Sequence, residues 1–162
     1  MNAVLLLAAL TALPCTVEDS LTAYERPGLS AEVFGTIAPG EVIEVLVITG
    51  SEWLGFDPGT AQAGNSGSFH YRWLPPNSLP VTDSLEVVWA PKPGVTYIMT
   101  SEDTPVYSDA DTASTVLITL PAGSGAEMAG VKMGWVYVDL WESSVEEDIQ
   151  GWVISDIITI KW

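Results

Sequence analysis

The fold of this chain is decided by a stretch that occurs twice. The first copy contains Val33-Phe34-Gly35-Thr36-Ile37-Ala38-Pro39-Gly40, and the second contains Val116-Leu117-Ile118-Thr119-Leu120-Pro121-Ala122-Gly123. Upstream, each copy has a tyrosine, Tyr24 or Tyr107, and the two copies keep one register with a shift of 83 positions (24 to 107, 40 to 123). A repeat of this length indicates a whole small domain, because solenoid repeats are roughly 20–50 residues long.

The similarity continues downstream of the Pro-Gly and Ala-Gly turns. Trp53-Leu54-Gly55-Phe56-Asp57 is matched by Trp135-Val136-Tyr137-Val138-Asp139, and Arg72-Trp73-Leu74 is matched by Gly151-Trp152-Val153. The shift at the tryptophan is 82 (53 to 135), so one residue is missing in the intervening turn. The repeat predicts an apolar segment at 1–15, a first module at 16–76, a connector at 77–101 and a second module at 102–162.

Short β-prone runs separated by turn residues dominate both modules. In the first module we expect strands at Thr22–Tyr24, Val33–Ile37, Glu41–Thr49, Trp53–Asp57 and Phe69–Leu74. In the second we expect them at Pro105–Tyr107, Val116–Leu120, Gly125–Val131, Trp135–Leu140 and Gly151–Ile154. Five short strands per module predict an all-β chain of two small barrels. The Pro-containing connector, with strand-like runs at Leu85–Trp89 and Thr96–Met99, is expected to be ordered.

Strand alternation predicts which aromatic side chains avoid the core. In Trp135–Asp139, Val136 and Val138 are the natural core residues, which leaves Trp135 and Tyr137 on the other face. The same argument places Leu54 and Phe56 inward and Trp53 outward in the first module. A tryptophan at the same outward place in both modules is either a plate that packs against a loop or a platform for a ligand.

The charge balance excludes some classes of partner. Five Lys and Arg residues against 21 Asp and Glu residues give a net charge of −16, which opposes binding to nucleic acids and to anionic membranes. Such a charge fits solubility in an exported protein, attraction to a cationic partner, or loose calcium binding. Asp109 with Asp111 and the run Glu146-Glu147-Asp148 are the acidic groups concerned, and neither has the spacing of an EF-hand loop.

The chain has few residues that could support catalysis or a tightly bound metal. It contains one cysteine, Cys15, and one histidine, His70, which can form neither an internal disulfide nor a zinc site. The sequence has no G-x-S-x-G, no H-E-x-x-H and no Gly-rich phosphate loop. We therefore expect no enzymatic activity, no metal and no cofactor.

The N-terminal segment is typical of an exported protein. Ala3 to Leu13 is apolar apart from Thr11, which is too short to span a membrane and fits the apolar region of a signal peptide. Cys15 follows it and resembles the lipid-attachment cysteine of bacterial lipoproteins, although Pro14 is atypical there. The alternative is that Cys15 packs in the first strand of the first module.

The order and duplication of these motifs resemble bacterial SH3-like (SH3b) domains. The resemblance rests on Tyr24, Val33–Gly40, Trp53–Asp57 and Arg72-Trp73-Leu74, with their counterparts in the second copy, and it covers around two-thirds of the chain. It implies two SH3-like barrels in tandem, export, and a non-catalytic role in the cell envelope, where family members target cell wall or bind peptide. Arg72 stands where the family usually has glycine.

Two functions from different classes follow. The first is a binding or scaffolding protein that holds an envelope or extracellular protein or a neutral glycan on surface aromatic residues: Tyr24, Trp53, Tyr107, Trp135, Tyr137 and Trp141. Anionic wall polymers are disfavoured by the charge of −16. The second is a structural subunit of an envelope or extracellular assembly, docked through the apolar C-terminal run Ile154–Trp162, although these residues also fit the last strand of a barrel.

Overall fold

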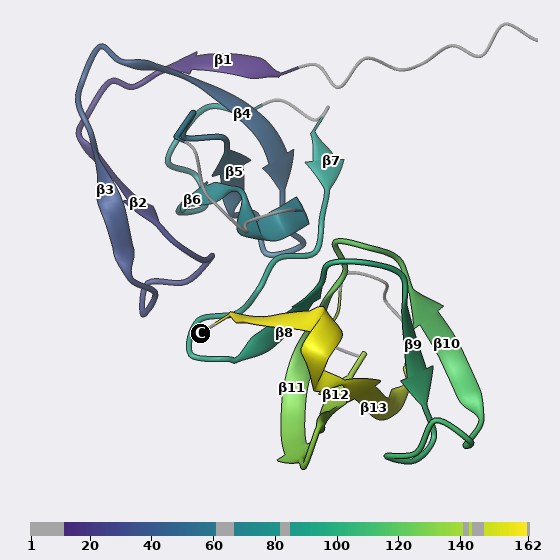
Figure 1. Ribbon diagram of the computed structural model, residues 1–162. Helices are drawn as coiled ribbons and strands as arrows, with labels where there is room; N and C mark the ends of the chain where they lie inside the picture. The colour runs from purple at the N-terminus through teal and green to yellow at the C-terminus, as the bar shows by residue number, and fades with distance from the viewer. Residues whose placement is uncertain (1–11, 61–66, 82–84, 141–142, 144–147, 162) are drawn as a thin grey trace, which may run out of the picture.

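The computed structural model describes residues 12–60, 67–81, 85–140, 143 and 148–161, and it shows an all-β chain (Figure 1). Fourteen strands form two seven-stranded sheets, and within the described residues only two 3₁₀ turns, η1 (Gly67–Phe69) and η2 (Ser155–Ile157), are helical. The all-β prediction is confirmed. Among these residues there is no helix of the length and apolarity that crossing a membrane requires.

The first sheet contains the strands of the first copy. They are β1 (Leu13–Thr16), β2 (Leu21–Tyr24), β3 (Val33–Ile37), β4 (Val42–Ile48), β5 (Leu54–Phe56), β6 (Arg72–Leu74) and β7 (Glu86–Val87). The order across the sheet is β1-β4-β5-β6-β2-β3, with β7 paired in parallel to β4. β3 therefore ends this sheet on one side, as Figure 1 also shows.

The second sheet contains the remaining strands. They are β8 (Tyr97–Thr100), β9 (Thr104–Tyr107), β10 (Val116–Leu120), β11 (Gly125–Lys132), β12 (Trp135–Asp139), β13 (Gln150–Ile154) and β14 (Ile158–Lys161). The order is β10-β9-β13-β12-β11-β8-β14. The apolar C-terminal run thus supplies an edge strand, because Ile160 of β14 pairs with Ile98 of β8.

The two sheets repeat the same strand register, and the repeat begins earlier than the sequence motif. Cys15 of β1 pairs with Ile43, and the residues 83 positions later, Ile98 of β8 and Ala126, pair in the same way (15 to 98, 43 to 126). β1 and β8 are therefore equivalent strands. The predicted boundary at residue 15 falls inside β1, and the boundary at residue 101 directly follows β8. The sequences of these two strands share too little for the repeat to be visible there.

A glycine turn is repeated with equal fidelity. The Gly40 N–H donates to the Val17 carbonyl oxygen at 2.8 Å, and the Gly123 N–H donates to the Thr100 carbonyl oxygen at 2.7 Å. Both glycines have positive φ, 87° and 82°, a backbone conformation that L side chains rarely adopt. The Pro-Gly and Ala-Gly signals in the sequence mark this turn, which connects β3 to β4 and β10 to β11.

Each sheet encloses its own apolar core on the face that strand alternation predicts. Leu54 and Phe56 are buried in the first core, and Val136 and Val138 in the second. The strands expected in both copies are present to within about two residues, except Phe69–Leu74. There, Gly67–Phe69 forms a 3₁₀ turn and only Arg72–Leu74 is a strand, because Phe69 packs against aromatic residues beyond the first sheet.

The connector is ordered in the part that the structure describes, and it is divided between the two sheets. β7 pairs with β4, and the Val88 N–H donates to the Ile48 carbonyl oxygen at 2.8 Å. Further along the chain, Pro93 lies so close to Gly28 that a Cβ there would be 2.4 Å from the proline ring. The connector therefore packs along the first sheet before it enters the second as β8.

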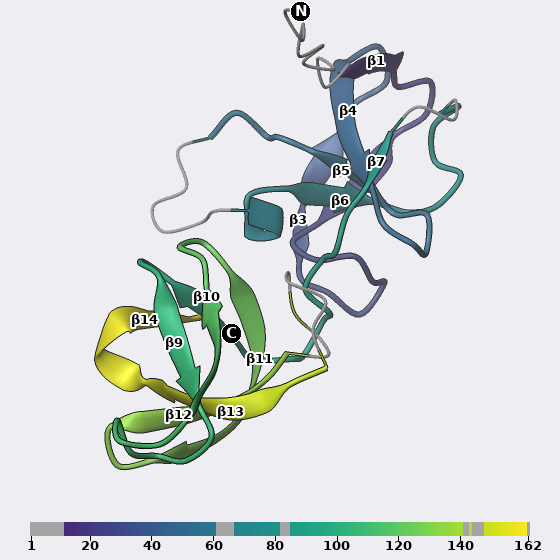
Figure 2. The ribbon, with the colours of Figure 1, turned by 90° about the vertical axis from the view of Figure 1, so that its right-hand side faces the viewer.

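Aromatic residues join the two sheets. Phe69 of η1 packs edge to face on Tyr97 of β8, with ring centroids 5.8 Å apart, and at a tilt against Trp89 of the connector, with centroids 6.1 Å apart. A Cβ on Gly125 of β11 would lie 2.9 Å from the Phe69 ring, so the first sheet touches the second directly. Figure 2 shows η1 on the side of the first sheet that faces the second.

Arg26 closes this junction as a buried cation. Its Nη1 donates to the carbonyl oxygens of Lys92 and Val95 at 2.8 and 2.5 Å, and its guanidinium lies 5.4 Å from the Tyr97 ring centroid. Loss of hydration lowers the pKa of Arg26 from its ordinary value. The side chain is 9% exposed, so removing it would leave two carbonyl groups without their charged donor.

We predict that Arg26→Ala lowers the free energy of unfolding by about 2–3 kcal/mol, because hydrogen bonds from a charged donor are lost in a buried place. Urea denaturation of the whole chain measures this. Lys132→Ala, which removes an exposed cation, is the control and is expected to change stability by less than about 0.5 kcal/mol. Equal effects of the two substitutions would contradict the proposed junction.

Candidate functional site

A row of aromatic side chains crosses three strands of the second sheet. Trp152 of β13 is paired with Tyr107 of β9 on one side and with Tyr137 of β12 on the other. Side chains at paired positions project from the same face of a sheet. The rings of Tyr137 and Trp152 lie 4.9 Å apart at 52°, so they form a continuous surface rather than separate contacts.

Trp135 completes this surface. It precedes Tyr137 by two residues and therefore lies on the same face of β12. Its ring meets Tyr107 edge to face, with centroids 5.5 Å apart and planes at 90°. We call Tyr107, Trp135, Tyr137 and Trp152 the aromatic face, and all four side chains are half-buried. Ring contacts hold them to one another, and none of the four residues is fully buried.

Polar groups lie beside the aromatic face. Gln150 donates from Nε2 to Asp139 Oδ2 at 2.8 Å, across the β12–β13 pair. Tyr137 Oη is 3.4 Å from Gln150 Oε1. On the opposite side, the ammonium group of Lys132 is 6.0 Å from the Trp152 ring centroid. Apolar rings with amide, carboxylate and ammonium groups at their margin suit sugar rings or an extended peptide.

The equivalent face of the first sheet is closed. Trp73 corresponds to Trp152 and is completely buried, in a cluster with Val47 and Trp53 to which Val88 and Ala90 of the connector add. Gly55 takes the place of Tyr137, and a Cβ there would lie 2.5 Å from Val47 and 3.0 Å from Trp73. The connector therefore covers in the first sheet what stays open in the second.

This arrangement corrects the expected surface role of Trp53. The side chain does lie on the face opposite the core, yet it is only 8% exposed. Tyr24 packs edge to face against it, with ring centroids 5.7 Å apart at 86°, and is itself half-buried. Trp53 is thus a packing plate, because the neighbouring Trp73 and the connector enclose it.

Of the other predicted site residues, Trp141 lies outside the described residues. Tyr107, Trp135 and Tyr137 are brought together as described above. Trp152 belongs to the repeated Gly-Trp-Val motif, and the sequence does not single it out as a site residue. Its pairing with Tyr107 and Tyr137 shows why it belongs to the face, and strand parity alone could not reveal which strands are neighbours.

Cys15 lies in β1 rather than in a free segment. Its side chain is 6% exposed and packs in the first core, and burial raises the pKa of its thiol. The equivalent residue in the second sheet is Ile98, a fully buried core residue. This geometry is that of a packed cysteine.

The acidic groups form turns and pairs. In the loop after β9, Asp111 Oδ1 accepts from the Ala113 N–H at 2.9 Å, and Ser114 Oγ donates to the Asp111 carbonyl oxygen at 2.7 Å. Glu146 and Glu147 lie outside the described residues. Within the part of the chain that the structure describes, no three His, Cys, Asp or Glu side chains are grouped to hold a metal ion.

Comparison with known proteins identifies no family. No family model matches the sequence, and no curated protein matches it. Two solved structures from Trichomonas vaginalis, NlpC2 and NlpC1, are similar to 96% of this chain, with 13% and 14% identity and TM-scores of 0.34 and 0.33. The chain spans about half the length of these two proteins, 50% and 48%.

We predict that two equivalent tryptophans contribute unequally to stability. Trp73→Ala is expected to cost about 3–5 kcal/mol of unfolding free energy, because a fully buried ring leaves a large cavity. Trp152→Ala is expected to cost less than half as much, since its ring is already partly in water. Urea denaturation of both variants tests this, and similar losses would show that the second face is as enclosed as the first.

Proposed function

We propose that this chain is a non-catalytic, exported binding protein of the bacterial cell envelope, which holds a protein or a neutral glycan on the aromatic face of the second sheet. The observation that carries the proposal is the asymmetry between the copies. Trp53 and Trp73 are buried in the first sheet, whereas their equivalents Trp135 and Trp152 are only half-buried in the second. Stability alone would favour covering both, because exposed aromatic surface forgoes the free energy of burial.

Two tandem SH3-like barrels are the architecture that we propose for this protein. The motif resemblance in both copies supports it, as does the shared register of the strands β1 to β6 and β8 to β13. Fold alone does not identify a ligand, so the ligand class rests on the aromatic face itself. A sugar ring or a peptide can stack there, while the net charge of −16 disfavours anionic polymers.

Export through the apolar N-terminal segment is part of the proposal, and lipid attachment at Cys15 is its weaker alternative. Acylation of Cys15 would require its sulfur to leave the first core, where it packs, and β1 would be displaced from β4. Mass spectrometry of the protein isolated from native membranes distinguishes the two, because an acylated cysteine adds the mass of the lipid.

The described residues give little support to catalysis. His70 pairs with Asp57, with Nε2 and Oδ2 2.8 Å apart, while Cys15 packs in the core. Asp57 and its counterpart Asp139 belong to different sheets, so the repeat does not bring them to one site. Hydrolytic turnover that disappears in Asp57→Ala or Asp139→Ala would contradict a non-catalytic role.

A structural subunit remains the second candidate, favoured by the edge strand β14. It ends the second sheet, and Ile160 is 38% exposed there. Such an edge can pair with a strand of another chain. Size-exclusion chromatography with light scattering separates the two functions: a subunit is expected to associate, and a monomer that sediments with cell walls would defeat this alternative.

Two binding measurements test the main proposal: co-sedimentation with purified bacterial cell walls and capture of envelope proteins. Both compare the unaltered chain with the variants Trp135→Ala and Tyr137→Ala. We expect at least about tenfold weaker binding in each variant, because truncating an anchoring aromatic residue removes much of the contact area. Leu29→Ala is the control, since it removes a 74% exposed apolar side chain from the first module. Binding that is unchanged in both aromatic variants would exclude the aromatic face.

A further inference from the structure

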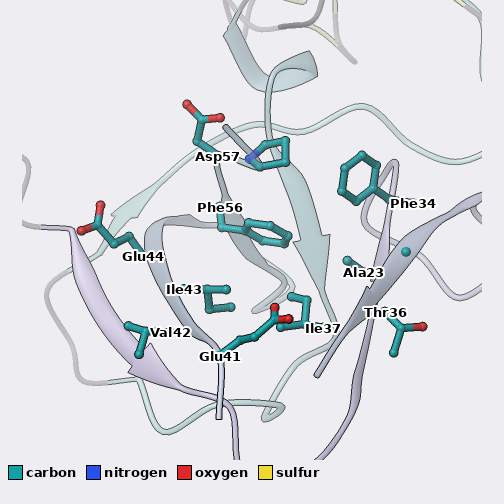
Figure 3. Close-up of a pocket in the computed structure, with 12 residues that line it drawn as sticks. Ala23, Phe34, Thr36, Ile37, Glu41, Val42, Ile43, Glu44, Phe56 and Asp57 are labelled. Carbon is teal, nitrogen blue, oxygen red and sulfur yellow. The ribbon is translucent and has the colours of Figure 1, made fainter. Parts of the chain in front are cut away.

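A groove in the first sheet lies between β3 and the strands β4 and β5, away from the aromatic face. Its volume is about 460 Å³. Figure 3 shows Ile37, Ile43 and Phe56 at its base and Phe34 along one side. Ile37 and Phe56 are also members of the first core, so the groove reaches the core surface.

Comparison of the two copies shows what is missing from this groove. Gly35 of β3 is paired with Ala23, and the equivalent pair in the second sheet is Ile118 with Val106 (35 to 118, 23 to 106). Ile118 packs against the second core. A Cβ on Gly35 would have no atom within 4 Å. The groove therefore includes the space that an aliphatic side chain fills in the sister sheet.

Arg72 supports the wall of the groove. Its counterpart Gly151 has no room for a side chain, because a Cβ would lie 2.6 Å from Val106 and 2.7 Å from the Tyr107 carbonyl oxygen. In the first sheet, the Arg72 guanidinium lies 4.9 Å from the Phe34 ring centroid, and its Nε is 3.1 Å from Glu25 Oε2. The positive charge of Arg72 is therefore held between the Phe34 ring and Glu25. Arg72 is not among the residues that line the groove.

The rim of the groove is acidic. Glu41, Glu44 and Asp57 line it, and among the described residues no lysine or arginine does. Asp57 accepts from the Gly59 N–H at 2.8 Å and is paired with His70, and these two contacts lower its pKa, so it remains ionised at neutral pH. A bound group that places positive charge at this rim would be favoured.

We propose that the groove binds an extended peptide segment of a partner protein, with an aliphatic side chain in the space at Gly35 and a neighbouring lysine or arginine at the acidic rim. In the described part of the chain β3 ends the sheet and no strand pairs with its outer edge, so a further strand can add there. The aliphatic side chain reproduces the place of Ile118. This site is separate from the aromatic face, and the proposal does not depend on the function proposed above.

The test uses capped hexapeptides titrated into the whole chain and followed by isothermal calorimetry. One probe alternates isoleucine with lysine, the second alternates isoleucine with glutamate, and the third alternates serine with lysine. We expect only the first to bind measurably, and its affinity to fall as salt is added, because the rim attraction is screened. Equal binding of the glutamate peptide, or of the serine peptide, would overturn the proposal, as would no binding of the first probe at millimolar concentration.

Variants locate the binding. Gly35→Ile fills the groove and is expected to weaken binding of the isoleucine–lysine peptide at least about tenfold. Gly50→Ile is the matched control, because a Cβ on Gly50 also meets no atom within 4 Å but lies in the turn after β4. The double variant Glu41→Gln with Glu44→Gln keeps the size of both side chains and removes two charges from the rim. The same weakening of peptide binding is expected, without any change in packing.

The two proposed sites can fail independently. Trp135→Ala is expected to leave binding of the peptide unchanged, and Gly35→Ile is expected to leave binding to cell walls or envelope proteins unchanged. Peptide binding that is lost in Trp135→Ala but kept in Gly35→Ile would place the peptide on the aromatic face and overturn the groove.

Discussion

Burial of Trp73 beneath the connector is the contact on which the surfaces of this protein depend. Its ring is fully enclosed by Val47, Trp53 and the chain that follows β7. This packing holds the connector along the first sheet, from which it passes through Trp89 and the Arg26 junction into β8. This contact closes the face of the first sheet that corresponds to the aromatic face. In the second sheet, Trp152 at the equivalent position stays half-buried.

Side-chain changes at equivalent positions distinguish the copies while the backbone register stays the same. Gly55 replaces Tyr137 where the first aromatic face is closed, Gly35 replaces Ile118 where the groove opens, and Arg72 replaces Gly151 beneath its wall. Each change removes or adds a side chain without moving the ladder of paired strands. A shared framework can therefore carry an aromatic face in one copy and an acidic groove in the other, because main-chain hydrogen bonds set the framework.

Much of the fold could be predicted from local sequence. Alternating apolar residues and repeated turn glycines located the strands and the inward positions of Leu54, Phe56, Val136 and Val138. The failures have physical causes. The sequence leaves a strand at Cys15 as one of two alternatives, because a four-residue strand there gains its stability from pairing with β4. Phe69 leaves the expected strand because its ring packs on Tyr97. Trp53 was expected at the surface, since parity gives the face of a strand but not what covers that face.

The sequence by itself determined the duplication, the all-β class and the side of each strand that meets the core, because turn chemistry and alternation act over a few residues. Only the tertiary structure decided which aromatic residues stay accessible and where the two copies differ in shape. Those properties depend on contacts between residues far apart in the chain, such as Trp73 with Val88 and Arg26 with Val95. The absence of a side chain at Gly35 becomes a groove only when β3 and β4 stand on either side of it.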